Sequence, residues 1–443
     1  MSTPPAVDAD VAIAGAGWAG LATAAVLSKQ GYKVLLLEAA AQSGGRARSI
    51  KTALGHLDNG QHIFIGAYTE LLELIRLLKI PESSLFIRQN LELKVYSKSD
   101  KQLHIKTSRL PGPLHLLVGL LTARGMSFAE KGSIIRCWLS LLLTDFKIAV
   151  DEPVSSFLIK KKQSPRLIKL FWEPLCIAAL NTPINTASTE IYLNVLQRTF
   201  KGKRSNSDFL FARTSLNELL PLPLSDYIRN QGAEIRLNER LKQIYINSNH
   251  SLCIETSSNT YTARHLILAT PFDQTRKLLS TIDSQADIAH SLTQFQHEAI
   301  TTLYMQFPET VRLDNYMCGL SDGMAQWFID RRSCGQAGMI AAVISANGEH
   351  MSMDKTSLTQ AIIAETLLLF PHWPPPLHTY LIREKRATFS CTANITPVRP
   401  KPGTIGQNIW LAGDYLDTGY PATLEGAIVS GVQCAQQLIE SEQ

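Results

Sequence analysis

The segment from residue 10 to residue 48 limits the possible fold more than any other part of the chain. A short apolar run, residues 11–14, is followed at once by Gly15-Ala16-Gly17-Trp18-Ala19-Gly20. An Ala- and Leu-rich pattern with helical spacing continues to Lys29, and a second apolar run, residues 34–37, ends at Glu38. Strand, glycine turn, helix, strand and acidic residue in this order predict a βαβ unit that binds a dinucleotide.

Each part of this pattern has a physical role. Gly15 permits the tight turn, Gly17 lets the backbone approach a pyrophosphate, and Gly20 allows the helix to pack closely on the sheet. The start of the helix presents free N–H groups and the positive end of its dipole to the phosphates. Glu38 can accept hydrogen bonds from both ribose hydroxyls and its charge repels a 2′-phosphate, so the pattern favours FAD or NAD over NADP. The same contacts are expected to include Ala16, Trp18, Ala19 and Ala39.

A second glycine turn, Ser43-Gly44-Gly45-Arg46-Ala47-Arg48, directly follows the acidic strand end. It resembles the GGR segment of the flavin amine oxidase and phytoene desaturase superfamily. The resemblance implies that Gly44 and Gly45 lie along the FAD pyrophosphate and that Arg46 contacts phosphate or flavin. Ordinary NAD dehydrogenases have no counterpart, so FAD becomes the favoured cofactor.

The string Asp58-Asn59-Gly60-Gln61-His62 is the next informative feature. It is similar to the corresponding string of the hydroxysqualene dehydroxylases, also called squalene-associated FAD-dependent desaturases. In such folds this loop passes close to the isoalloxazine ring, which implies cofactor contacts from Gly60, Gln61 and His62. His62, with Gln61 beside it, is the candidate catalytic acid. The alternative is that Asn59-Gly60 is only a turn and that His62 is an edge-strand residue.

The C-terminal section carries a second cofactor signal. A predicted strand, residues 409–412, ends in Gly413-Asp414, and residues 419–431 open the last helix. Asp414 can accept a hydrogen bond from the ribityl chain or bridge a phosphate through water. The start of the helix is expected to face the pyrimidine end of the flavin. Pro421, Ala422, Thr423 and Ala427 are further expected contacts. No cysteine lies between Asp414 and Gly431, so we expect FAD to be held non-covalently.

The resemblance runs over nearly the whole chain and implies its architecture. It covers residues 10–62, 171–183, 216–271 and 380–432. It implies an α/β fold in which a Rossmann-like FAD-binding domain of the amine oxidase type is interleaved with an α+β substrate-binding domain. The expected FAD-binding domain comprises residues 1–95, 206–285 and 386–443, and the expected substrate-binding domain comprises residues 96–205 and 286–385.

The resemblance implies that two further segments lie near the cofactor. Leu241 is placed against the adenine, and Ala269 and Thr270 end a strand beneath the cofactor. The charged string Arg383-Glu384-Lys385-Arg386 matches the family as well. It forms either an ion-paired strand end or a contact to flavin or phosphate.

Composition narrows the class of protein and its surroundings. A chain of 443 residues exceeds what one hydrophobic core usually serves, and its net charge of +5 is too small to indicate nucleic acid. Seven scattered cysteines without a C-x-x-C motif fit a reducing compartment and give no metal site. Neither a signal peptide at Met1–Pro5 nor a transmembrane run is predicted. We therefore expect a cytoplasmic protein, associated peripherally with the inner face of the cell membrane.

Residues 110–150 are the most apolar part of the chain. They either form buried helices of the second domain or an amphipathic patch that dips into the membrane. The core alternative suits most of these residues, but a lipid-facing mouth nearby is favoured because a very apolar substrate must arrive from the bilayer.

The resemblance implies a reaction. Hydride from reduced FAD would replace the hydroxyl of hydroxysqualene, giving squalene and water, with the electrons supplied by an unidentified donor. An isoprenoid desaturase of the phytoene type would use the same motifs in the oxidative direction. A prenyl-binding protein of the Rab GDP dissociation inhibitor class is the non-enzyme alternative, but Glu38, Arg46 and Asp414 argue against it.

Overall fold

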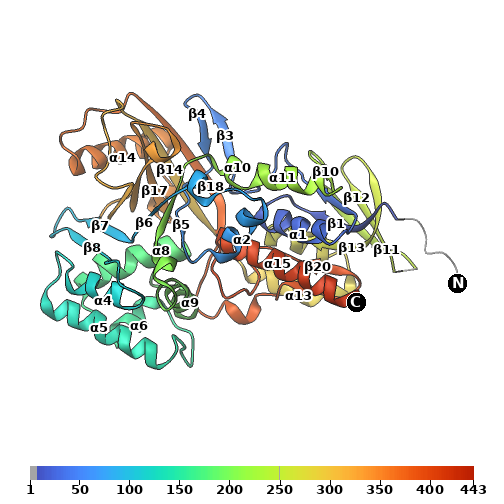
Figure 1. Cartoon of the computed structure of the whole chain (residues 1–443), viewed down its shortest axis with the longest axis horizontal. Coiled ribbons are helices and arrows are strands. Elements are labelled where there is room, and N and C mark those ends of the chain that lie inside the picture. Colours follow the sequence, from blue (N-terminus) through green and yellow to red (C-terminus); the bar gives the residue numbers. More distant parts are fainter. Residues whose placement is uncertain (1–6, 249) are drawn as a thin grey trace.

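Two large β-sheets organise the chain (Figure 1). The structure is a computed structural model that describes residues 7–248 and 250–443. Residues 1–6, where the sequence predicts no signal peptide, lie outside the described part. The fold is of the α/β class. A sheet whose central strands are parallel lies at one end of the molecule, and a largely antiparallel sheet lies at the other.

The predicted βαβ unit forms the centre of the first sheet. β1 (Ala9–Ala14) lies between β2 (Val34–Leu37) and β13 (Thr260–Leu268), and all three strands are parallel. Apolar residues run continuously through residues 11–14 of β1 and through β2 because both faces of a parallel sheet are covered. In the described part of the chain, the remaining strands of this sheet are β10 (Glu234–Arg236), β11 (Leu241–Ile246), β12 (Leu252–Thr256), β19 (Gly403–Thr404) and β20 (Ile409–Leu411).

Helices cover both faces of the first sheet. Val11 and Ile13 of β1 face a core shared with α1 (Trp18–Lys29), α11 (Pro221–Asn230) and α15 (Leu424–Ser441). Ala12 and Ala14 face the opposite core, to which α12 (Phe272–Leu279) and α13 (Ala286–Ser291) contribute. This alternation follows from the two-residue period of a strand.

The second sheet has the order β18-β14-β17-β16-β15-β7-β8. Its strands are β7 (Glu92–Tyr96), β8 (Leu103–Lys106), β14 (His297–Gln306), β15 (Met317–Leu320), β16 (Trp327–Asp330), β17 (Met339–Ser345) and β18 (His378–Phe389). On β14, Leu303 and Met305 pack toward α14 (Lys355–Leu369), whereas Tyr304 points to the other face. That second face meets the residues 57–62 loop, so this sheet forms one wall of the site.

The remaining elements of the described chain are two small sheets and further helices. Two small sheets contain β3 (Ser49–Thr52) with β4 (Gly55–Asp58), and β5 (Phe64–Ile65), β9 (Phe209–Ala212) and β6 (Phe86–Gln89). The helices are α2 (Thr69–Leu77), α3 (Glu82–Leu85), α4 (Leu114–Leu121), α5 (Phe128–Leu143), α6 (Val154–Lys160), α7 (Pro165–Leu167), α8 (Glu173–Leu180), α9 (Thr189–Phe200) and α10 (Leu216–Leu219). None of the helices in the described residues is both long and apolar enough to cross a bilayer.

The domain limits derived from the sequence stay a prediction. The structure adds two details to them, because β7 and β18 both belong entirely to the second sheet. The expected limits after residues 95 and 385 therefore each cut through a strand of that sheet, in which β7 pairs with β8 and β15, and β18 pairs with β14.

Candidate active site

The first glycine turn shows why each of its three glycines is present. Gly15 has a φ of +107°, and a Cβ there would lie 2.6 Å from the carbonyl oxygen of Ala269. A Cβ on Gly20 would lie 1.9 Å from the carbonyl oxygen of Gly15. At Gly17 the nearest atom would be the Cα of Gly45, at 3.9 Å. The protein's own packing therefore requires Gly15 and Gly20 but not Gly17. The role predicted for Gly17, close approach of the backbone to a pyrophosphate, is compatible with this open space and stays a prediction.

Two neighbours of these glycines have roles in the protein's own packing. The indole N–H of Trp18 donates to the carbonyl of Ala47 at 2.9 Å and ties the start of α1 to the second glycine turn. Ala19 is buried against α15, where a Cβ on Gly431 would lie 2.4 Å from its carbonyl oxygen.

Glu38 directly follows β2, and its carboxylate is directed back at the glycine turn. The carboxylate accepts the backbone N–H of Ala16 and that of Ala40, each at 2.8 Å, and the residue is buried. The backbone N–H of Glu239 donates to the carbonyl of Glu38 at 2.8 Å, which brings the start of β11 and Leu241 to the same corner. Ala39, the next residue, is exposed there. The expected adenosine contacts thus gather at one place.

The second glycine turn lies directly against the first. The N–H of Gly44 donates to the carbonyl of Ala16 at 2.8 Å, and a Cβ on Gly45 would lie 3.0 Å from the Cα of Gly17. Arg46 leaves this turn to form an ion pair with Asp414 at 2.6 Å and a hydrogen bond with the carbonyl of Ala387 at 2.9 Å. Both predicted phosphate-binding turns and the distant Gly-Asp strand end therefore share one location.

The remaining predicted cofactor residues also lie at the carboxyl ends of the parallel strands. The N–H of Ala269, followed by Thr270, donates to the carbonyl of Ala14 at 2.9 Å. The N–H of Gly413 donates to the hydroxyl of Ser430 in α15 at 2.8 Å. In open α/β sheets ligands bind at this edge.

The start of α15 completes this edge. Thr423 caps α15 by accepting the N–H of Gly426 at 3.0 Å, with Pro421 and Ala422 in the loop before it and Ala427 in the first turn. Two glycine turns, a buried acid, an arginine and a helix N-terminus form a set of groups that fits FAD.

The charged string at the end of β18 closes over this region. Arg386 pairs with Asp273 at 3.0 Å, and Glu384 accepts the side-chain amide of Asn59 at 3.0 Å. Arg386 is therefore ion-paired, as one of the two alternatives from the sequence expects. A contact of this string with flavin or phosphate stays a prediction.

A buried polar network holds the Asp58–His62 loop. The Asp58 carboxylate accepts from Arg331 at 2.6 Å, from the Ser49 hydroxyl at 2.7 Å and from the Leu216 N–H at 3.0 Å. Arg331 and Asp58 are each about 95% buried. Such a pair is stable only when its remaining hydrogen-bonding atoms have partners, which these extra donors supply.

The same network fixes the side chain of Gln61. Its amide oxygen accepts from Arg331 at 3.2 Å, and its amide nitrogen donates to the Tyr304 hydroxyl at 2.5 Å. Tyr304 in turn donates to the backbone carbonyl of Asp58 at 2.7 Å. Burial raises the pKa of Tyr304 well above its ordinary value, so its hydroxyl stays protonated. Gly60, with a φ of +103°, forms the turn between Asp58 and Gln61.

Sequence reasoning missed Tyr304 and Arg331. Tyr304 lies on β14, and Arg331 follows β16 directly, so each is more than 240 residues from the loop that it holds. The one local signal is the Asp330-Arg331-Arg332 run immediately after an apolar strand, where a buried charge needs a partner.

His62 differs from its neighbours because its ring has a free hydrogen-bonding atom. Within the described residues, its Nδ1 is buried and has no hydrogen-bond partner. Burial lowers the pKa of His62, and the nearby Asp58 opposes this shift only in part. A buried and unpartnered ring nitrogen beside the predicted flavin residues is a place where a ligand atom can bind.

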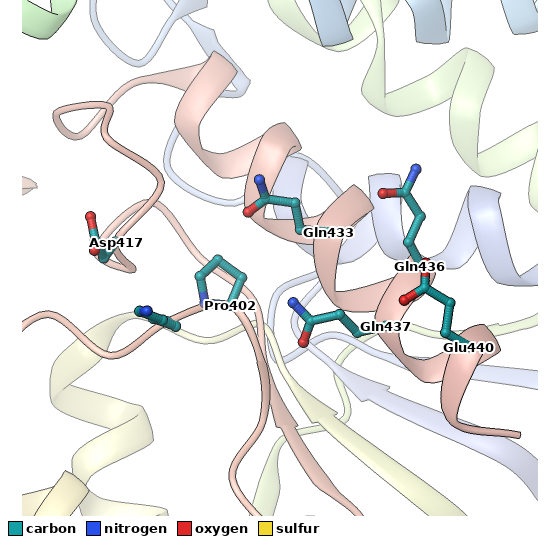
Figure 2. A pocket seen from close by; sticks show the side chains of 7 residues that line it. Pro402, Asp417, Gln433, Gln436, Gln437 and Glu440 are labelled. Atoms are coloured by element: carbon teal, nitrogen blue, oxygen red, sulfur yellow. The ribbon is translucent and has the colours of Figure 1, made fainter.

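The surroundings of the loop are apolar. Leu57, Leu170 and Phe211 belong to one buried cluster that also contains the inner face of the second sheet, with Ile63 and Phe171 packed against it. A different pocket, of about 270 Å³, lies beside α15 and is shown in Figure 2. It is lined mostly by polar side chains, among them Asp417, Gln433 and Gln437, and therefore does not suit an isoprenoid.

Comparison with known proteins agrees with this geometry. The family described as flavin containing amine oxidoreductase matches residues 18–439. A hydroxysqualene dehydroxylase of Zymomonas mobilis is 27% identical, over 96% of this chain and 97% of that protein. A chloroplastic 15-cis-phytoene desaturase of an Oncidium hybrid is 24% identical over 99% of this chain and 79% of that protein.

A solved structure shows the same fold. Cyclohexylamine oxidase from Brevibacterium oxydans superposes with a TM-score of 0.71 over 98% of this chain and 99% of that one, at 16% identity. The family match spans almost the entire chain, from the start of α1 into the last turn of α15. The chain therefore belongs to the flavin containing amine oxidoreductase family, and it is an oxidoreductase whose cofactor is FAD.

Proposed function

We propose that the protein is an FAD-dependent hydroxysqualene dehydroxylase that converts hydroxysqualene to squalene and water. The observation that carries the proposal is its similarity to the Zymomonas hydroxysqualene dehydroxylase over almost the full length of both chains. By comparison, the match to the Oncidium phytoene desaturase covers 79% of that protein's length. The Asp58–His62 string and the apolar surroundings of the site support the same substrate class.

The cofactor contacts proposed for this chain are those predicted from the sequence. Gly15, Gly17, Gly45 and Arg46 would hold the pyrophosphate, and Glu38 the ribose. The loop of Gln61 and His62 and the start of α15 would lie beside the ring. When bound in its reduced form, FAD supplies the hydride that replaces the hydroxyl.

The chain's own residues must supply a proton, because hydroxide is a poor leaving group. Hydroxysqualene gains one hydride and one proton, its C–O bond breaks, and the oxygen leaves as water. His62 is the proposed acid, since its Nδ1 is unpartnered within the described residues and lies in the loop beside the cofactor. Gln61 cannot donate a labile proton but can position the hydroxyl, because Arg331 and Tyr304 hold its amide in one orientation.

The runner-up is a phytoene-type desaturase, which the second group of relatives supports. It would remove hydride from an apolar isoprenoid and would need no acid for a leaving group. The polar network around Gln61 and the free nitrogen of His62 give the dehydroxylase the better fit.

The direct test is anaerobic turnover of purified protein that is saturated with FAD and reduced with dithionite. Squalene formed from hydroxysqualene, with no product in the unreduced control, is the expected result. Phytoene supplied with oxidised FAD and a quinone acceptor forms the opposing arm. Desaturation there, without squalene formation in the first arm, would overturn the proposal.

The physiological setting is part of the same proposal. A hydrophobic substrate of this kind resides in lipid, so we propose a cytoplasmic protein that works at the inner face of the cell membrane. Its electrons come from a donor that the sequence does not identify.

A further inference from the structure

Helix α4 has an inverted distribution of polar and apolar residues. Its buried residues are His115 and Gly119, and the His115 Nε2 lies 2.9 Å from the hydroxyl of Ser207. Leu114, Leu117 and Leu121 lie on the opposite side and are exposed. A helix on the surface of a water-soluble protein normally has the reverse arrangement. Most of residues 110–150 were expected to lie in the core, but these three leucines of α4 do not.

Helix α5 continues the exposed apolar surface. Ser133, Ile134, Cys137 and Leu141 face the interior, and a second stripe at helical spacing faces outward. That outer stripe contains Phe128, which is 92% exposed, Leu139 and Leu143, which is 89% exposed. Burying such side chains in a lipid phase is favourable in proportion to their area.

These side chains are concentrated in one part of the molecule. Thirteen large apolar side chains are exposed in the described residues, and nine of them lie between residues 110 and 159. Figure 1 shows α4, α5 and α6 together at the lower left end, away from both termini and from the FAD-binding sheet. We name this surface the α4–α6 face; it comprises Leu110, Leu114, Leu117, Leu121, Phe128, Leu139, Leu143, Val150 and Ile159.

The charge of the same segment is positive. Residues 109–162 contain eight Lys and Arg against four Asp and Glu, so they hold net +4 of the chain's +5. A groove of about 520 Å³ runs between α5 and α6, with Leu141, Ile148 and Phe157 among its apolar lining. Lys147, Lys160 and Lys161 also line it, together with Glu152, which pairs with Lys160 at 2.6 Å. Apolar side chains beside lysines match the acyl region and the anionic headgroups of a bilayer.

We propose that the α4–α6 face docks on an anionic phospholipid bilayer, with its leucines and Phe128 in the acyl boundary and its lysines at the phosphates. A second copy of the chain is a poorer occupant, because a symmetric dimer through this face would bring two +4 segments together. The contact is interfacial, since no described helix could span the bilayer. Delivery of substrate through this face rests on the proposed function; the docking itself does not.

Vesicle flotation of the FAD-loaded protein tests the surface. The vesicles contain either phosphatidylcholine alone or phosphatidylcholine with about 30% phosphatidylglycerol. We expect F128S/L143S to bind the mixed vesicles at least tenfold more weakly than wild type. L368S/L377S, which changes two exposed apolar residues outside the face, should bind like wild type. Removing phosphatidylglycerol or raising the salt concentration should weaken wild-type binding.

Three results would overturn the proposal. They are no vesicle binding by wild type, equal loss in both double variants, or a dimer seen by sedimentation that F128S/L143S disrupts while vesicle binding persists. Failure of the proposed function is detected separately, because squalene formation is measured with substrate in detergent micelles. There F128S/L143S should keep wild-type turnover, whereas with substrate in vesicles its turnover should fall with its binding.

Discussion

Arg46 and Asp414 form an ion pair at 2.6 Å although 368 residues separate them in the sequence. Arg46 comes from the second glycine turn and Asp414 from the end of β20, so the pair joins the N-terminal and C-terminal parts of the FAD-binding domain. Each residue was predicted independently to contact the cofactor. Because the two side chains pair with each other, the two predicted cofactor contacts lie at one location in the fold.

Replacing Arg46 by Met should weaken FAD binding. The substitution removes a cation from the phosphate region and leaves the Asp414 carboxylate without its partner. We expect the Kd for FAD to rise at least tenfold, which corresponds to about 1.4 kcal/mol. Flavin fluorescence titration of the apoprotein measures this. R76M removes an arginine of the exposed Arg76–Glu73 pair and should change nothing; an unchanged Kd in R46M would contradict the role of Arg46.

The glycines of the first turn should respond differently to alanine. In G20A the new Cβ would meet the Gly15 carbonyl, so unfolding should become easier by about 1–3 kcal/mol despite the better helix propensity of Ala. In G17A the Cβ meets no protein atom closer than 3.9 Å, so the apoprotein should stay as stable as wild type while FAD binding falls. Urea unfolding and FAD titration separate the two effects. Equal FAD affinity in G17A and wild type would show that the pyrophosphate does not bind at this turn.

Local patterns explain why the cofactor half of the site could be predicted. The order of apolar runs, glycines and acid around Gly15, Gly20 and Glu38 is set by short-range backbone geometry, which a sequence displays directly. The contacts of Gln61 with Tyr304 and Arg331 depend instead on how two distant strands are placed in the second sheet. No spacing rule connects residues so far apart.

The exposed helices show a second limit of sequence reasoning. The run of leucines in α4 is compatible with either side of the helix being buried, because apolar residues occupy most of its positions. Only the packing of His115 and Gly119 against the rest of the domain decides which leucines face outward.

Arg331 should be important for stability as well as for the orientation of Gln61. R331M leaves Asp58 charged and buried, and loss of one partner of a buried pair costs about 3–5 kcal/mol. The Ser49 and Leu216 donors to Asp58 place the expected loss near the lower end of that range. Urea unfolding of the FAD-saturated protein measures it. R229M, which breaks an exposed pair, should cost less than about 1 kcal/mol, and a similar small cost in R331M would contradict the prediction.

The proposed acid predicts a pH dependence of squalene formation. His62 must be protonated to donate, and burial lowers its pKa below the ordinary value of 6.5. kcat/KM should therefore fall as pH rises through that lowered pKa, so the activity is highest on the acidic side. H62Q should be at least about tenfold slower and should lack this limb of the profile. A wild-type profile that is flat between pH 5 and about 7, or one that H62Q leaves unchanged, would exclude His62 as the acid.

Glu425 should give the folded protein a separate dependence on pH. The residue lies in the first turn of α15, is fully buried, and accepts the backbone N–H groups of Glu70 at 2.8 Å and Leu71 at 3.0 Å. Burial raises the pKa of Glu425 from 4.5 to about 7, and these two hydrogen bonds oppose the shift only in part. Between those pH values the folded protein binds more protons than the unfolded chain. The free energy of unfolding therefore falls as pH rises from 4.5 to about 7, by about 3 kcal/mol from this residue.

E425Q removes the titrating group and separates this contribution from that of all other carboxylates. The difference in unfolding free energy between E425Q and wild type should move in favour of the variant as pH rises from about 5 to 7.5, because only wild type must then ionise a buried acid. Urea unfolding at constant FAD saturation measures the difference at each pH. E73Q, a substitution at an exposed glutamate of α2, should show no such trend. If the E425Q difference were the same at both pH values, the carboxylate would already be ionised at pH 5, and its two backbone N–H donors would have outweighed its burial.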